Sequence, residues 1–151
     1  MLKYTTDSNG EDILLDSNDS QVMMEWEKPY MEACINKLQP KGDVLEIGFG
    51  FGYSATQIQK HNPKSYTIVE CDPTVIERCK EWAKNYNNVT IIHAKWQEVI
   101  CTNKLGKYDE VFFAVGVHPY DCENYNLETL KEYVNHPKCI AVGECGLDYF
   151  R

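Results

Sequence analysis

The feature that most constrains the fold of this chain is the stretch LEIGFGFG at residues 45–52, where three glycines follow a short apolar run. The apolar run is typical of a buried strand, and the next segment, YSATQIQKHN, is typical of a helix. Glycine at Gly48, Gly50 and Gly52 lets the backbone turn tightly and come close to a ligand. Such a turn also occurs without a ligand, so the loop alone is a weak indication of a binding site.

Strand-like and helix-like segments alternate along most of the chain. The expected strands are residues 43–50, 65–72, 88–94, 108–117 and 138–145, and the expected helices are residues 21–38, 53–62, 73–83 and 126–136. This alternation predicts an α/β fold, a three-layer Rossmann-like sandwich around a parallel sheet of about five strands. Right-handed crossovers and a switch point beside the first of these strands favour the order 3-2-1-4-5.

The N-terminal residues 1–19 are polar and rich in Asp, Ser and Asn, which suggests a flexible arm or a lid segment. Asp19 or Ser20 can cap a helix that starts near Gln21, and Pro29 should break or bend that helix. At the third expected helix, Asp72 followed by proline predicts a start with Pro73 in the first turn.

Glu70 ends the second expected strand of the α/β pattern, about 20 residues after the glycines. A carboxylate at this place can accept hydrogen bonds from both hydroxyls of a ribose, although a solvated strand end is the simpler interpretation. NAD and S-adenosylmethionine compete for this geometry, whereas the loop lacks the lysine pattern of a P-loop. Glu46, just before the glycines, favours S-adenosylmethionine, because its sulfonium and ammonium groups suit an acidic neighbourhood.

The composition narrows the classes of partner. A net charge of −8 argues against binding to nucleic acid or to an anionic membrane surface. The seven cysteines form no C-x-x-C pair and no apolar leader begins the chain, so we expect reduced thiols in a cytoplasmic protein. No apolar run approaches the length that spans a bilayer.

Four blocks in the same order, QVMMEWEKPYMEA, VLEIGFGFGYSA, YTIVECD and HAKWQEV, resemble the guanidinoacetate N-methyltransferases over residues 20–113. These are class I enzymes that depend on S-adenosylmethionine. The resemblance implies that Met23 and the glycine loop line the cofactor, that Glu70 holds its ribose and that Trp96 lies near its adenine. It also implies a small guanidino or amine compound as methyl acceptor, with Glu27 gripping the guanidinium.

The same residues have plainer interpretations without the resemblance. Met23 and Trp96 would be packing residues, and Glu27 would be a surface charge. The family's acidic residue after the next strand falls at Ala114, and the final strands of the usual fold are absent from the chain. Methyl transfer needs a positioned nucleophile and the removal of a proton, so the chain is expected to bind cofactor with impaired catalysis, or to bind it only.

From residue 115 onward the chain is similar to TatD-type metal-dependent hydrolases, a family that includes DNases, in its blocks GVHP and AVGECGLDY. This resemblance implies that Glu144 is a metal-bridging carboxylate with His118 nearby, but the four histidines form no His-x-His pair. A metal site needs several converging ligands, so a working hydrolase fragment is the weaker alternative. In the preferred interpretation, residues 114–151 supply a β-α-β fragment that completes the methyltransferase sheet after a join at residues 113–115. A fused or truncated product without its own function is a third interpretation.

Overall fold

The computed structural model describes residues 1–101, 110–112, 114–117 and 141–145. The chain divides into two compact units, Met1–Glu110 and Val111–Arg151. The first unit contains nearly all of the described residues and all of the residues expected to bind a cofactor.

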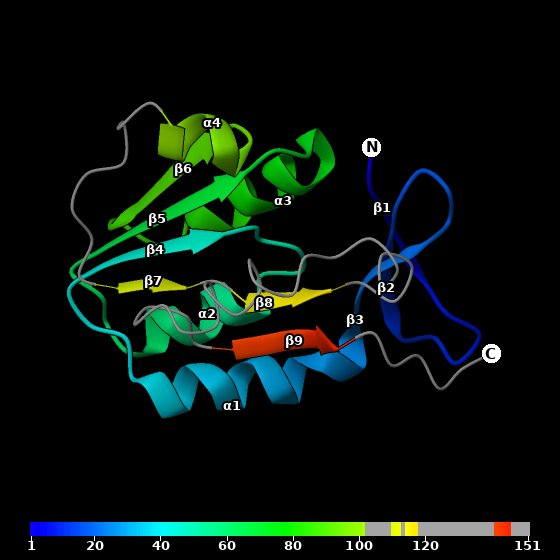
Figure 1. Cartoon of the computed structure of the whole chain (residues 1–151), viewed down its shortest axis with the longest axis horizontal. Coiled ribbons are helices and arrows are strands. Elements are labelled where there is room, and N and C mark those ends of the chain that lie inside the picture. The colour runs from blue at the N-terminus through cyan, green and yellow to red at the C-terminus, as the bar shows by residue number, and fades with distance from the viewer. Residues whose placement is uncertain (102–109, 113, 118–140, 146–151) are drawn as a thin grey trace. The chain divides into compact units, whose positions relative to one another are not determined.

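The body of the first unit is a parallel sheet covered by helices (Figure 1). Strands β4 (Asp43–Ile47), β5 (Ser65–Glu70) and β6 (Val89–His93) pair in the order β6-β5-β4. Nearly every side chain of β5 is buried, as expected for a strand covered on both faces. The predicted α/β class and the 3-2-1 part of the predicted strand order are confirmed.

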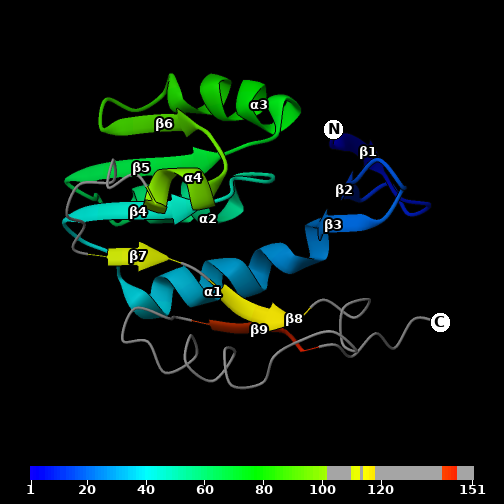
Figure 2. The same ribbon diagram turned by 45° about the horizontal axis from the view of Figure 1, so that its top comes forward.

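Three helices follow the strands of this sheet: α2 (Tyr53–Lys60), α3 (Pro73–Ala83) and α4 (Trp96–Cys101). Helices α2 and α3 lie on one face of the sheet, and α4 lies over the other (Figures 1 and 2). The carboxylate of Asp72 accepts hydrogen bonds from the backbone N–H groups of Thr74 and Val75, and Pro73 occupies the first turn of α3. The predicted start of this helix is therefore confirmed, and the structure adds a side-chain cap by Asp72.

The first predicted helix begins later than the sequence suggested. Residues Gln21–Met24 form strand β3, a short 3₁₀ turn η1 (Glu25–Glu27) follows, and helix α1 spans Lys28–Leu38. The predicted cap at Asp19 or Ser20 is therefore wrong, because pairing of β3 with a neighbouring strand overrides the helical spacing of its apolar residues. Pro29 does not break α1, since it lies in the first turn, where its missing N–H costs nothing.

Regular structure also occurs where the sequence suggested an arm. Strands β1 (Lys3–Thr6), β2 (Asp12–Leu15) and β3 form an antiparallel meander in the order β1-β2-β3. The polar clusters form its two turns: the carboxylate of Asp7 accepts N–H bonds from Asn9 and Glu11, and that of Asp16 accepts them from Asn18 and Ser20. The Asp-, Ser- and Asn-rich composition of this segment is typical of disordered chains, but here it forms Asx turns between short strands.

The predicted fourth strand, residues 108–117, contains two strands in the structure. Strand β7 (Glu110–Phe112) spans the boundary between the units, and β8 (Ala114–Val117) pairs in parallel with β9 (Ala141–Cys145). The predicted helix at residues 126–136 lies outside the described residues, and the five-strand order remains a prediction. Among the described residues, no helix has both the length and the apolar character of a membrane span.

Candidate cofactor site

The glycine loop lies between β4 and α2, at the carboxyl end of the sheet. All three glycines have positive φ angles: 84° at Gly48, 54° at Gly50 and 79° at Gly52. The loop starts from a fixed point, because the Gly48 N–H donates to the carbonyl of Val69 on β5 at 2.8 Å. Side chains rarely adopt this backbone conformation, so the repeated glycines are a geometric requirement of the turn.

The room for an added side chain or a ligand differs between the three glycines of the loop. A Cβ added at Gly50 would lie 2.6 Å from Cε of Met23, and one added at Gly52 would lie 2.5 Å from Cζ of Phe49. A Cβ added at Gly48 would meet nothing within 4 Å. The loop is therefore closed by protein at its second and third glycines and open at its first, which leaves room for a ligand beside Gly48.

Met23 reaches the glycine loop from strand β3. Its sulfur lies 3.4 Å from the backbone nitrogen of Phe51, whose N–H points toward it, and its terminal methyl packs on Gly50. The structure thus brings together Met23 and the loop, two elements that the sequence separates by about 25 residues and that the resemblance assigned to one site.

Glu70 is bound directly to the glycine loop. Its Oε2 accepts the N–H of Phe49 at 3.0 Å, while its Oε1 accepts the N–H groups of Cys71 at 2.6 Å and Asp72 at 2.9 Å. The side chain is 8% exposed. Three N–H donors suit an ionised carboxylate, which has about four acceptor positions, so the carboxylate keeps acceptor capacity on Oε2. This arrangement fits a ribose hydroxyl at the strand end.

Glu46 lies on β4, two residues before Gly48, and is also 8% exposed. Its Oε2 accepts a hydrogen bond from the hydroxyl of Tyr66, a residue of β5 that is fully buried. Burial raises the pKa of Glu46 from 4.5 to about 8; the Tyr66 hydrogen bond opposes that rise, and the charge of Glu70 adds to it. Glu46 is thus mostly protonated at neutral pH in the protein without ligand.

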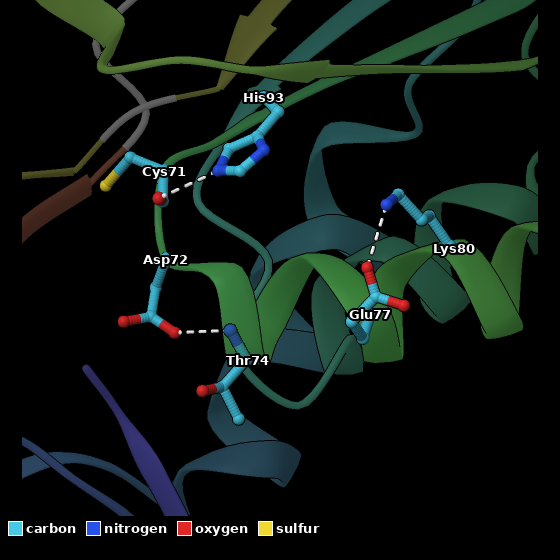
Figure 3. A network of polar contacts seen from close by, with 6 residues as sticks. All are labelled: Cys71, Asp72, Thr74, Glu77, Lys80 and His93. Atoms are coloured by element: carbon cyan, nitrogen blue, oxygen red, sulfur yellow. Dashed lines mark hydrogen bonds and ion pairs between the residues drawn. The ribbon is translucent and has the colours of Figure 1, made fainter.

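The segment after β5 is fixed by polar contacts, which Figure 3 shows. A ring nitrogen of His93, the last residue of β6, lies 3.2 Å from the carbonyl oxygen of Cys71. Asp72 caps α3 through Oδ1 and accepts the N–H of Leu2 on Oδ2 at 2.8 Å. On the outer side of α3, Lys80 and Glu77 form an exposed ion pair at 2.8 Å. The segment after Glu70 is therefore tied by hydrogen bonds to β6, to the first turn of α3 and to Leu2.

The two remaining predicted residues lie on other elements. Trp96 is the first residue of α4, directly after β6, and 47% of it is exposed. Glu27 closes the η1 turn, where its Oε1 accepts the N–H of Met24 at 2.7 Å. Glu27 therefore has a local structural role, because it binds the backbone of Met24, the residue next to Met23. Neither position contradicts the predicted roles.

A cleft of about 530 Å³ lies against the glycine loop. Gly52, the hydroxyl residue Thr56 and a set of aromatic, basic and acidic side chains line it. That set is Lys28, Glu32, Phe49, Phe51, Tyr53, Lys60, Arg78, Glu81 and Trp82. Of the residues predicted for the site, this cleft includes only Gly52. The aromatic residues between the glycines, Phe49 and Phe51, are the sequence signal that could have drawn attention to it.

The residues that the TatD resemblance singled out form no described metal site. No group of three His, Cys, Asp or Glu side chains that could hold a metal occurs within the described part of the chain. Glu144 lies on β9, and His118 falls outside the described residues.

Comparison with known proteins identifies the family. The model of the guanidinoacetate N-methyltransferase family matches residues 3–141. Protein arginine N-methyltransferase 2 of Candida glabrata is 39% identical over 119 residues, which are 74% of this chain and 27% of that protein. The Saccharomyces cerevisiae protein of the same name is 32% identical over 120 residues, which are 74% of this chain and 28% of that protein. The chain thus spans little more than a quarter of the length of these relatives.

Solved structures support the fold. Spermidine synthase from Thermotoga maritima has a TM-score of 0.52 at 20% identity and covers 72% of this chain and 45% of its own. TYW2 from M. jannaschii, solved in complex with AdoMet, has a TM-score of 0.50 at 22% identity and covers 74% of this chain and 50% of its own. At these identities the likeness establishes a shared Rossmann-like fold.

The family match also bears on the predicted join. It runs through residues 113–115 without interruption and ends at residue 141, so neither the TatD-like interpretation of this stretch nor a fusion is supported. The sequence-based assignment to S-adenosylmethionine-dependent methyltransferases is confirmed at the level of the family. The chain belongs to the guanidinoacetate N-methyltransferase family.

Proposed function

We propose that this chain binds S-adenosylmethionine and forms the cofactor-binding part of a methyltransferase that acts on arginine side chains of proteins. The observation that carries the first half is the direct hydrogen bond between Glu70 and the glycine loop, beside the open space at Gly48. The loop and the ribose-binding carboxylate form one unit, as a nucleoside-containing cofactor requires. This cofactor, when bound, supplies a methyl group on a sulfonium, which is an electrophile for a nitrogen nucleophile.

The chain's own residues divide the work of binding. Gly48 leaves room for the cofactor beside the backbone, and Gly50 and Gly52 give the loop its tight turn against Met23 and Phe49. Met23 borders the cofactor, and Glu70 accepts a ribose hydroxyl. Glu46 offers a carboxyl group to the cationic end of the cofactor, and Trp96 offers an aromatic face to the adenine.

The acceptor is inferred from the relatives. Both relatives compared above are named protein arginine N-methyltransferase 2, which favours a guanidinium carried by a protein over the small guanidino or amine compound that the sequence suggested. Glu27 is the carboxylate assigned to grip that guanidinium, because a carboxylate can accept two parallel N–H bonds from it. This chain spans only part of the length of its relatives. The assignment of the whole acceptor site therefore depends on the inference from the relatives' names.

Isothermal titration of the full chain with S-adenosylhomocysteine tests the cofactor half of the proposal. We expect saturable binding that Glu70→Gln abolishes and that Glu77→Gln, a matched change in an exposed carboxylate, leaves intact. No binding to folded wild-type protein at high micromolar ligand would overturn it.

The acceptor class has its own test. The chain is incubated with methyl-labelled S-adenosylmethionine and either an arginine-rich protein or guanidinoacetate. Label transferred to the protein supports the proposal. Label found only on guanidinoacetate overturns the assignment of a protein-arginine acceptor while leaving cofactor binding to the titration.

A further inference from the structure

The N-terminal meander is attached to the cofactor site at three points. The hydroxyl of Tyr4 on β1 donates to the carbonyl oxygen of Gly50 at 2.6 Å, and the sulfur of Met23 on β3 receives the N–H of Phe51 at 3.4 Å. The backbone N–H of Leu2, just before β1, donates at 2.8 Å to Asp72, the residue that caps α3. Strands β1 and β3 are the two edges of the meander, so the loop is contacted from both.

Two of these contacts hold a single peptide group. The carbonyl of Gly50 and the N–H of Phe51 are the two polar ends of one planar peptide unit. Tyr4 binds one end and Met23 the other. Gly50 has a φ of 54° and no side chain that would restrict its backbone angles. The orientation of the Gly50–Phe51 peptide therefore depends on contacts with other residues.

Tyr4 is itself held firmly in place. Its ring meets the Phe51 ring edge to face, with 5.1 Å between the centroids, and the Arg78 guanidinium lies 4.8 Å from the Tyr4 ring and 5.2 Å from the Phe51 ring. Such aromatic and cation–π contacts fix the direction in which the hydroxyl points. Burial raises the pKa of Tyr4 to about 12, so its hydroxyl stays protonated near pH 7 and can donate a hydrogen bond.

We propose that Tyr4 is a positioning residue for the methyl-donor site: it holds the Gly50–Phe51 peptide in the orientation that the glycine loop needs to receive the cofactor. The inference deepens the proposed function and rests on it for its effect on binding. It assigns a role in cofactor affinity to the meander, 46 residues before the loop in the chain.

The test compares Tyr4→Phe with Tyr86→Phe in the full chain. Tyr4→Phe removes only the hydroxyl and keeps the ring between Phe51 and Arg78. Tyr86 packs on Trp82 with 4.6 Å between the ring centroids, and its hydroxyl makes no hydrogen bond to any residue that the structure describes, so Tyr86→Phe is the control. We measure S-adenosylhomocysteine affinity by titration and amide hydrogen exchange at Phe51.

We expect Tyr4→Phe to weaken S-adenosylhomocysteine binding about five-fold, the effect of one net hydrogen bond, and to speed exchange at Phe51. Tyr86→Phe should change neither. Wild-type affinity in Tyr4→Phe would overturn the inference while leaving the proposed function standing. A wild-type chain that does not bind S-adenosylhomocysteine would overturn the proposed function. In that case, amide exchange at Phe51 tests whether Tyr4 holds the peptide. Faster exchange in Tyr4→Phe would support this role, and unchanged exchange would refute it.

Discussion

Glu46 and Glu70 lie at the carboxyl ends of neighbouring strands, and each is 8% exposed, yet their partners differ completely. Glu46 pairs with Ile68 in the β4–β5 register, so Glu70, two residues further along β5, points to the same face of the sheet. Glu70 accepts three backbone N–H bonds. Glu46 accepts the hydroxyl of Tyr66.

The difference shows that burial alone does not decide the charge of a carboxyl group. Three backbone N–H donors compensate Glu70 for the loss of water. A single phenol does not compensate Glu46, so burial raises its pKa to about 8, and the nearby charge of Glu70 adds to that rise. One end of the sheet therefore holds a carboxylate bound by three backbone N–H groups beside a carboxyl group whose pKa is raised by burial.

The largest effect expected from this difference is on stability as a function of pH. The pKa of Glu46 is raised in the folded chain, so its contribution is fully present below about pH 4.5 and is lost as the pH rises through about 8. The unfolding free energy of the wild type should fall relative to Glu46→Gln by up to about 4 kcal/mol over this range. Urea unfolding at a series of pH values measures it.

Glu46→Gln is the matched control, because its amide oxygen can still accept the Tyr66 hydroxyl and the side chain does not titrate. A difference between wild type and variant that is the same at pH 5 and pH 9 would contradict a protonated Glu46.

Removal of the charge at Glu70 should have the next largest effect. Gln at this position presents an NH₂ group to backbone N–H donors, so at least one buried donor loses its partner. We expect a loss of about 3 kcal/mol in unfolding free energy at pH 7, measured by urea unfolding. Glu77→Gln, at an exposed carboxylate paired with Lys80, should change stability far less. Equal losses in the two variants would show that the three N–H bonds do not stabilise the loop.

The sequence predicted the part of the fold in which local signals agree with tertiary contacts. The strand–glycine–helix unit at residues 43–60 and the start of α3 at Asp72-Pro73 follow from periodicity and from the preference of proline for the first helical turn, and both are present. The meander was missed because its strands are only four residues long and its turns are polar. Strand β3 has helical spacing, and only its pairing with β2 makes it extended.

Residues of the candidate site could be predicted where they belong to one sequence motif. The glycines and Glu70 could be picked out from the sequence, because their spacing is that of residues at the carboxyl ends of two neighbouring parallel strands. Tyr4 could not, since nothing in a short polar strand indicates that its hydroxyl reaches the carbonyl of Gly50. The protonation of Glu46 was equally hidden, because it depends on the burial of the carboxyl group, which only the folded sheet and its covering elements produce.

The smallest expected effect concerns protons exchanged when the cofactor binds. If the cationic end of the cofactor lies beside Glu46, as the sequence predicted, binding stabilises the ionised carboxylate and releases up to one proton near pH 7, because the pKa of the free group is about 8. Titration with S-adenosylmethionine in phosphate and in Tris should therefore give different apparent enthalpies, since the two buffers take up protons with different heats. Glu46→Gln should remove this dependence on the buffer. The same dependence in wild type and variant would assign the proton to another group and place Glu46 away from the cofactor's charge.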